Sequence, residues 1–404
     1  MLLTNLLAQL ALGLTAMTIC LPSMQEWGDL FGATQAQVQL TFSGFVVAFG
    51  VCQLVYGPLS DRYGRKGVLM TGLALLAAGS LMAALAPNLE LLIAARILQG
   101  MGSAAGSVVG RAMVQDLFAG SQRTKVMAYV GMAMGLSPPF AAVIGGHMHV
   151  RFGWASNFML ILVLTLMLLL AAWRGLPGRT STAAPGGHWL PSMLSAYASL
   201  LRQKTLMLYV LILCMSTAAF YVFLSGAPIV LRSYGVGPAG VGWYLMLVPL
   251  SYVTGNFLTS RLIHSKGERR VMALGQVASL AGLALMLGLA FLGLDSPLAF
   301  SAPLMLLGLG HGFLVPPSLA GTVGVVPALA GSAAALAGLT QQLMGALGGY
   351  SVGLVSHQGS RNLGLLMLGF TLCALAAHLA LRRHSPQQSP TSQASGVSAR
   401  APRD

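Results

Sequence analysis

The stretch GPLSDRYGRK, residues 57–66, is a short charged segment between two long apolar ones. Its charged residues are Asp61, Arg62, Arg65 and Lys66. Gly57 and Gly64 permit backbone geometry and close approach that a Cβ would hinder. Because Pro58 has no N–H to donate, we expect the preceding helix to end there. The stretch therefore predicts a tight loop whose charges are held by fixed partners.

The composition is that of a membrane protein. The chain has 404 residues, of which 56% are hydrophobic and only 7% charged, and its mean hydropathy is +0.77. Soluble domains carry about 25% charged residues. Apolar runs of about 18 or more residues can cross a bilayer as helices, which satisfy every backbone polar group internally. The sequence therefore predicts an all-α protein that crosses the membrane many times.

Twelve apolar segments are predicted to form twelve transmembrane helices. They lie near residues 5–25, 38–57, 67–86, 89–112, 124–148, 154–173, 205–226, 239–260, 270–292, 298–320, 331–356 and 361–382. The loops after the second, fourth, sixth and eighth helices and the C-terminal tail hold most of the lysines and arginines, whereas the opposite loops hold only Arg151, Arg232 and Arg361. By the positive-inside rule both termini are expected in the cytoplasm. The net charge of +14 then reflects orientation and not binding to nucleic acid.

The predicted helices fall into two six-helix halves, residues 1–173 and 205–382. Residues 174–204 are rich in Gly, Pro, Thr and Ser and are expected to form a cytoplasmic linker between the halves. Residues 383–404 are polar and rich in Pro and Ser, which predicts a disordered cytoplasmic tail. Paired halves of this kind are typical of transporters that bind substrate near the membrane midplane.

The stretch at residues 57–66 resembles the loop between the second and third helices of major facilitator superfamily transporters, whose signature is G-x-L-x-D-R-x-G-R-[RK]. The matching residues are Gly57, Leu59, Asp61, Arg62, Gly64, Arg65 and Lys66. This resemblance implies a twelve-helix major facilitator fold with a central cavity that opens alternately to either side. It also implies that Asp61 and Arg65 hold a cytoplasmic gate by pairing with the N-terminal end of the eleventh helix, near Gly331. A carboxylate is favoured at a helix N-terminus.

The fourth predicted helix carries a second match. Its run R-x-x-Q-G-x-G-x-A resembles the superfamily's motif at Arg96, Gln99, Gly100, Gly102 and Ala104. A charge inside the membrane is costly and by default marks a functional site. The resemblance associates Arg96 with proton coupling or substrate binding. The alternative is an arginine that snorkels outward and only anchors its helix.

Arg111 and Asp116 close the fourth helix in the run RAMVQDLF, which looks like the sequence after helix four in the Bcr/CflA drug-resistance branch of the superfamily. The two residues are expected either to form a local cytoplasmic ion pair or to take part in gating. The sequence does not choose between these two roles.

The fifth predicted helix contains GLSPPFAAVIGG at residues 135–146. Here Pro138, Gly145 and Gly146 match the motif that marks exporters within the superfamily. Proline and glycine bend a helix and allow tight packing, which we expect at the interface between the two halves. The family's second proline is replaced by Ala142, and Pro139 is additional, so the antiporter signature is altered.

The first predicted helix lacks the acidic residue expected from the resemblance. Bcr/CflA-like proteins usually read T-D-x-Y-L-P there, whereas this chain reads MTICLP at residues 17–22. Protonation of a carboxylate in the membrane is the simplest way to couple proton and substrate movement. All acidic residues here lie in loops or at helix ends, so the proton carrier has to be sought elsewhere. Its candidates are His311 in the tenth helix, and Glu26 and Glu90 near the outer mouth.

Histidine titrates in the range that proton coupling needs. The alternative for His311 is a neutral side chain hydrogen-bonded to a neighbouring helix. The remaining cavity candidates are polar or aromatic residues on helices that usually line the cavity, and most such residues are ordinary packing. They are Phe220, Tyr221, Tyr244, Tyr252, Gln341 and Gln342. An interior that is apolar and aromatic suits lipophilic or amphipathic organic substrates better than sugars or phosphates.

The sequence leaves three functions open. The first is export of small organic, drug-like molecules in exchange for protons across a bacterial inner membrane. The second is a proton-independent facilitator or uptake carrier, and the third a membrane sensor that does not transport. An enzyme is not expected, because no nucleophile–base set, metal cluster or nucleotide-binding loop is present. The four cysteines lie far apart in apolar segments, which indicates neither a disulfide framework nor a metal site. We expect a monomer without a cofactor, driven by the proton gradient.

Overall fold

The structure, a computed structural model, describes residues 2–178, 189–356 and 359–384. Within these ranges the secondary structure is helical, without strands. The elements before the linker are α1 Leu2–Thr18, η1 Leu21–Ser23, α2 Met24–Phe31, α3 Gln35–Tyr63, α4 Arg65–Ala84, α5 Leu89–Leu117, α6 Gly120–Phe152 and α7 Ala155–Gly175.

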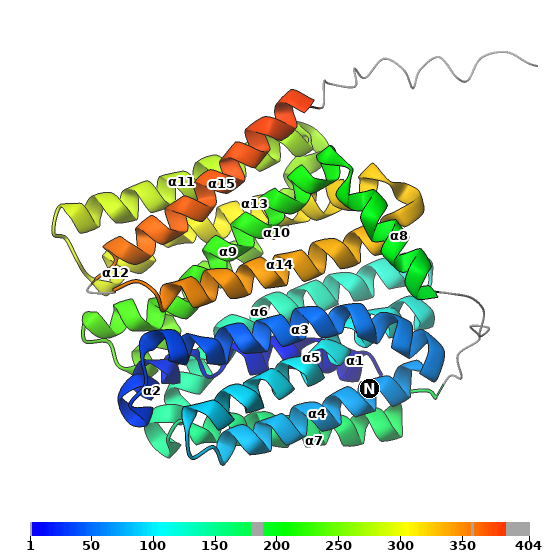
Figure 1. Cartoon of the computed structure of the whole chain (residues 1–404), viewed down its shortest axis with the longest axis horizontal. Helices are drawn as coiled ribbons and strands as arrows, with labels where there is room; N and C mark the ends of the chain where they lie inside the picture. The colour runs from blue at the N-terminus through cyan, green and yellow to red at the C-terminus, as the bar shows by residue number, and fades with distance from the viewer. Residues whose placement is uncertain (1, 179–188, 357–358, 385–404) are drawn as a thin grey trace, which may run out of the picture.

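The elements after α7 are α8 Trp189–Leu201, α9 Lys204–Ser233, α10 Pro238–Lys266, α11 Glu268–Phe291, α12 Pro297–Ser301, α13 Leu304–Val325, η2 Pro327–Leu329, α14 Ala330–Val352 and α15 Arg361–His384. Figure 1 shows α1 to α7 gathered in the lower part of the molecule and α9 to α15 in the upper part. The predicted linker therefore contains a helix, α8, that the sequence analysis missed. The predicted tail lies almost wholly outside the described residues.

The expected membrane fold is present. In the described chain, eleven helical stretches are long and apolar enough to cross a membrane when α1 is joined to α2 and α12 to α13. The twelfth long helix is α14, whose 23 residues include several glycines and two glutamines that lower its hydropathy. It packs between α3 and α9, among the other long helices. The structure therefore has the predicted twelve long helices.

Proline positions explain where the predicted helix ends were wrong. Pro58 does not end its helix, because α3 continues through it to Tyr63. A proline keeps a helical φ and removes only its own hydrogen bond, so the turns on either side can carry the helix onward. The first predicted helix, in contrast, is broken, since α1 ends at Thr18 and Pro22 lies in the separate short η1. Pro303 similarly separates α12 from α13.

The helices alternate in direction, so the bundle has two ends. One end carries the turns at Gly64 and Gly267 and is named the basic end, after the lysines and arginines around it. The opposite end carries the turns at Gly32 and Gly153 and is named the far end. All four glycines have positive φ, a conformation that other residues adopt at a cost. These turns let consecutive helices reverse direction with few connecting residues.

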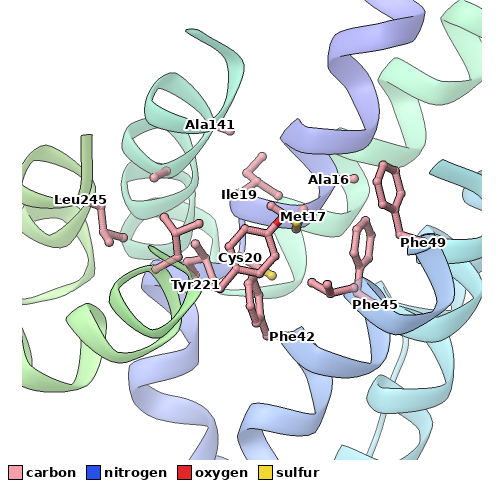
Figure 2. Close-up of a cluster of buried hydrophobic side chains, with 14 of the residues drawn as sticks. Ala16, Met17, Ile19, Cys20, Phe42, Phe45, Phe49, Ala141, Tyr221 and Leu245 are labelled. Atoms are coloured by element: carbon pink, nitrogen blue, oxygen red, sulfur yellow. The ribbon is translucent and has the colours of Figure 1, made fainter. Parts of the chain in front are cut away.

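The two groups of helices meet along α3 and α14, which run antiparallel. A Cβ built on Gly50 would lie 2.6 Å from the Cβ of Gln342, and one built on Gly338 would lie 3.7 Å from the Gln53 side chain. Figure 2 shows a second contact between the two groups, a buried cluster in which Phe42 of α3 lies close to Tyr221 of α9. The main hydrophobic core thus includes residues from both groups.

Candidate functional site

The loop after α3 is held by the guanidinium of Arg65. This group pairs with Asp61, its Nε lies 3.1 Å from Oδ2 of Asp116, and its Nη1 lies 2.6 Å from Oγ of Ser60. Gly64 has φ of 90° and forms the turn itself. Arg65 therefore ties together the ends of α3, α4 and α5. The charges of this loop have fixed partners, as the sequence predicted.

Other residues of the loop differ in what they do. Lys66 donates from Nζ to the carbonyl oxygens of Trp173 and Leu176, at 2.7 and 2.9 Å, and so fastens α4 to the end of α7. The guanidinium of Arg62 lies over the ring of Tyr63. Gly57 lies within α3, and a Cβ there would meet nothing within 4 Å, so the predicted close approach at Gly57 is wrong.

The end of α5 corrects another expectation. Asp116 is bound by Arg65 and not by Arg111, whose Nη2 instead lies 3.6 Å from the sulfur of Met134 on α6. The local Arg111–Asp116 ion pair is therefore not the arrangement found. Asp116 belongs to the same cluster as Asp61, which places it at the predicted gate.

Arg96 is fully buried and does not snorkel. Its guanidinium donates to the carbonyl oxygens of Ala16, Met17 and Thr41, at 2.8, 3.2 and 3.3 Å, and to Oε1 of Gln99 at 2.8 Å. The ring of Phe45 covers it, with the guanidinium carbon 4.4 Å from the ring centroid. Since α1 ends at Thr18, the carbonyls of Ala16 and Met17 lack helical partners, and Arg96 supplies them. The alternative of a snorkelling anchor is wrong.

The two glycines of α6 serve different neighbours. A Cβ on Gly145 would overlap the carbonyl oxygen of Ile19, which follows α1. A Cβ on Gly146 would overlap the carbonyl oxygen of Pro238, the first residue of α10. Pro138 lies inside α6, which continues past it. Gly145 therefore lets α6 pack closely against its own group of helices, and Gly146 lets it pack closely against the other group.

The far end is closed by contacts between the two groups of helices. The side-chain amide of Gln25 donates to the carbonyl oxygens of Pro228 and Val236, and Arg232 on α9 donates to the carbonyl oxygen of Gln25. Nη2 of Arg232 also lies 2.6 Å from Oδ2 of Asp29. Deeper in the interface, Gln39 on α3 donates to the carbonyl oxygen of Ser225 at 3.1 Å. Most of these contacts start from the short helix α2.

Glu26 on α2 also faces its own group of helices. Its Oε2 lies 2.9 Å from Nε2 of His149 on α6. Nδ1 of His149 lies 2.9 Å from Oγ of Ser23, which also accepts from Nδ2 of Asn157 at 3.0 Å. Glu90 lies apart from this cluster, exposed in the first turn of α5. The sequence analysis named Glu26 but missed its partners.

His311 lies in a group of aromatic rings. Its ring stacks on Phe220 with centroids 4.7 Å apart and planes 7° apart, and the Tyr252 ring lies 5.1 Å away. Nδ1 of His311 has no hydrogen-bond partner within the described chain, and its side chain is 6% exposed. The alternative of a histidine bonded to a neighbouring helix through Nδ1 is thus not what is found. The rings form a buried aromatic cluster, in which Nδ1 of His311 is a polar atom without a partner in the described chain.

The other predicted cavity residues lie close to this aromatic group, with one exception. The ring of Tyr221 contacts Phe220 and also Phe42 from α3. The hydroxyl of Tyr221 lies 3.3 Å from Oε1 of Gln342, and Nε2 of Gln341 donates to the Thr217 hydroxyl at 2.9 Å. Tyr244 lies eight residues before Tyr252 on α10, partly buried against the main core. The structure therefore brings together all of these residues except Tyr244.

Five residues that were not proposed as site residues from the sequence contribute to the contacts at the far end. They are Ser23, Gln25, His149, Asn157 and Arg232. His149 and Asn157 could have been singled out from the sequence, because a histidine or asparagine within an apolar segment needs a hydrogen-bond partner in the membrane. Their pairing with α2 could not be foreseen, because it joins residues more than 120 positions apart.

Comparison with known proteins identifies relatives over nearly the whole chain. The family model described as Major Facilitator Superfamily matches residues 2–349 and, in a second match, residues 209–402. Multidrug resistance protein D of Escherichia coli (strain K12) is 28% identical over 373 residues, which are 91% of this chain and 92% of the relative. A chloramphenicol resistance protein of Pseudomonas aeruginosa is 29% identical over 296 residues, covering 73% of this chain and 70% of the relative.

Solved structures agree on the fold. A bacterial homologue of the human lysosomal transporter Spinster superposes with a TM-score of 0.76 at 14% identity, covering 94% of this chain and 96% of that chain. The nucleoside transporter NupG superposes with a TM-score of 0.74, also at 14% identity, covering 94% of this chain and 98% of that chain. At such low identity these likenesses establish the arrangement of the helices and not a substrate.

Proposed function

The chain belongs to the Major Facilitator Superfamily, and we propose that it exports small organic, drug-like molecules by alternating access in exchange for protons. As a member of this superfamily it is a multi-pass membrane transporter and not an enzyme. Its relatives include proteins named for resistance to multiple drugs and to chloramphenicol. The resemblance to the drug-resistance branch, first read from short motifs, is confirmed by these relatives.

The observation that carries the choice of substrate is the aromatic group around His311. The rings of Phe220 and Tyr252 contact His311, whose Nδ1 has no partner within the described chain, and the ring of Tyr221 extends the group by contacting Phe220. Among the described residues, no acidic side chain is buried. Such a surface offers stacking and one hydrogen bond, and it offers sugars or phosphates few polar partners. Planar, lipophilic molecules fit it best.

The orientation belongs to the same proposal. The basic end is taken to face the cytoplasm of a bacterial inner membrane, with both termini on that side, because lysine and arginine collect there. The far end is then the outer end, and its interlocked α2 and α9 close the outer mouth. We expect a monomer that uses the proton gradient and needs no bound cofactor.

The gate at the basic end is supported by the register between α3 and α14. Gly50 is level with Gln342 and Gln53 with Gly338, and the two helices are antiparallel. Continuing this register along α3 brings Asp61 level with the first turn of α14, near Gly331. Within the described chain no side chain caps that first turn, although the N–H of Ala330 already donates to the carbonyl oxygen of Pro327. A carboxylate is favoured at such a helix N-terminus by the helix dipole. The predicted gate contact is consistent with this geometry.

A second candidate function keeps the fold but not the proton. Residues 17–22 lack the acid that drug–proton antiporters of this branch carry in the first helix. A carrier without a proton-binding carboxylate in the membrane can still exchange substrate down its gradient. This facilitator is favoured if transport ignores the proton gradient.

Transport by the purified protein in liposomes separates the two candidates. The vesicles receive a pH gradient, and a fluorescent lipophilic cation and the internal pH are followed together. Gradient-driven dye movement with matching proton flux supports the exporter. Dye exchange that is unaffected by a protonophore supports the facilitator. Protein-free vesicles serve as the control, and absence of dye movement above this control contradicts both for this class of substrate.

A further inference from the structure

A chain of hydrogen bonds runs inward from the outer surface beside α2. It begins at the carboxylate of Glu26, whose side chain is 52% exposed, and passes to His149, which is 8% exposed. It continues through the hydroxyl of Ser23 to the amide of Asn157, both fully buried. The four residues come from α2, α6, η1 and α7. A titratable group is thus connected to water on one side and to buried polar groups on the other.

The cluster can hold one proton more or one proton fewer without losing a hydrogen bond. With neutral His149, we assign the N–H to Nε2, which donates to Glu26, while Nδ1 accepts from the Ser23 hydroxyl. With a proton added at Nδ1, that nitrogen donates to Ser23 instead. The Ser23 hydroxyl then needs an acceptor, and Oδ1 of Asn157 is buried with no partner within the described chain. Turning the Asn157 amide over provides that acceptor.

The same short helix locks the outer mouth. Gln25, next to Glu26, binds carbonyl groups of the other helix group, and Asp29 binds Arg232. Trp27 is fully buried and contacts the rings of Trp154 and Phe158 on α7. Whatever holds α2 in this position therefore also holds the outer mouth closed.

We propose that Glu26 and His149 form a proton-binding site that closes the outer mouth when the outer solution is acidic. Protonation of His149 turns its hydrogen bond to the Glu26 carboxylate, in which only the acceptor is charged, into an ion pair between imidazolium and carboxylate. The stronger pair fixes α2 where it locks onto α9. Deprotonation weakens the pair and releases α2. The inference rests on the proposed orientation, in which the far end is the outer end.

The charged and titratable groups near Glu26 and His149 do not provide another buried proton-binding site on α2. Asp29 is already bound to Arg232, and both side chains are at least half exposed, so their ion pair is worth little. On α6, His147 faces the carbonyl oxygen of Val143 and the ring of Trp243, and Arg151 is exposed. The first turn of α7 carries no acidic residue. His149 is the titratable group among these that is buried and bound to α2.

The position of the site also sets its role. Glu26 remains exposed to the outer solution while the mouth is closed. A proton held there returns to the side from which it came, so the pair senses outer pH and does not itself carry the proton across. The site thus links pH to the conformational cycle without an acid in the membrane interior.

The test is the width of the outer mouth as a function of pH. Spin labels are attached to Phe152→Cys and Leu294→Cys, exposed positions at the outer ends of α6 and α11, after the four native cysteines are replaced by alanine. Their separation is measured in lipid nanodiscs from about pH 8 to about pH 5, the range in which histidine changes charge. Acidification is expected to raise the ratio of short to long distances about twofold to fivefold, the range for an ion pair with one partner half exposed.

Three variants complete the test. His149→Gln and Glu26→Gln keep hydrogen-bonding side chains but cannot form the ion pair, and we expect a ratio that no longer changes with pH. His147→Gln, two residues away on the same helix, is expected to respond like the parent. A parent ratio that does not change with pH, or a His149→Gln ratio that does, overturns the proposal. Because the measurement needs neither substrate nor gradient, either result leaves the efflux proposal to be judged by the liposome experiment.

Discussion

Gly146 of α6 lies directly against Pro238, the first residue of α10, so closely that a Cβ on the glycine would overlap the proline carbonyl oxygen. This contact joins the two groups of helices at the far end, where α2 and α9 also contact each other. The neighbouring Gly145 lies against Ile19 in the same way. Two consecutive residues thus fix α6 to both groups, and neither position leaves room for a Cβ.

Replacing Gly146 by alanine is expected to open the outer end. The added methyl group forces α6 and α10 apart, and overpacking of this kind costs about 1–3 kcal/mol. The labelled pair at residues 152 and 294 should then report longer distances, and transport should fall. Gly131→Ala is the matched control, since a Cβ at Gly131 on the same helix meets nothing within 4 Å. An unchanged distance distribution in Gly146→Ala would show that the contact does not limit closure.

Arg96→Lys is expected to destabilise the protein although it keeps the charge. An ammonium group cannot reach all four acceptors of the guanidinium, and each buried acceptor left unpaired costs about 1–3 kcal/mol. We expect a clear fall in the temperature of thermal unfolding in detergent. Arg361→Lys is the control, because Arg361 also donates to a carbonyl and lies over a ring but is partly exposed. Equal unfolding temperatures for both variants would contradict a structural role for Arg96.

Asp61→Asn is expected to impair transport without preventing insertion into the membrane. Arg65 keeps Asp116 and Ser60 as partners, so the loop should remain folded. The substitution removes the Arg65–Asp61 ion pair and, in the proposed gate, a charge at the first turn of α14, worth about 1 kcal/mol at a helix N-terminus, or roughly fivefold in the balance of states. Initial transport rates are measured at equal amounts of inserted protein. Normal rates for Asp61→Asn would remove this residue from the gate.

Phe220→Leu is expected to change which substrates are transported and how well. The variant keeps an apolar side chain but loses ring stacking on His311, worth about 0.5–1.5 kcal/mol. The apparent KM for planar aromatic dyes should therefore rise several-fold. Phe223→Leu, on the same helix and buried against Phe300, is the matched control and should leave the KM unchanged. If both variants shift the KM alike, the aromatic group is ordinary packing.

Much of the fold could be predicted from the order of apolar runs and glycines along the sequence. The twelve long helices and the turns between them follow from apolar runs and from glycines such as Gly64 and Gly267. Arg96 could be singled out because a charge in an apolar helix is conspicuous on its own. Helix ends were less predictable. Pro58 was expected to stop a helix and lies inside α3, whereas α1 ends at Thr18, four residues before Pro22. A proline by its residue type does not tell these two cases apart.

The candidate site shows the same division. The sequence by itself determined that this chain is a helical membrane protein, because a bilayer offers backbone groups no water and therefore permits few structures to an apolar chain. That it is a transporter came from the resemblance of its short motifs to the superfamily. Only the tertiary structure decided which side chains meet. Asp116 binds Arg65 and not Arg111, which is nearer in the sequence, and Glu26 binds His149 although they are more than 120 residues apart in the sequence. Such pairs depend on how helices rotate and cross when they pack, which no local pattern of residues specifies.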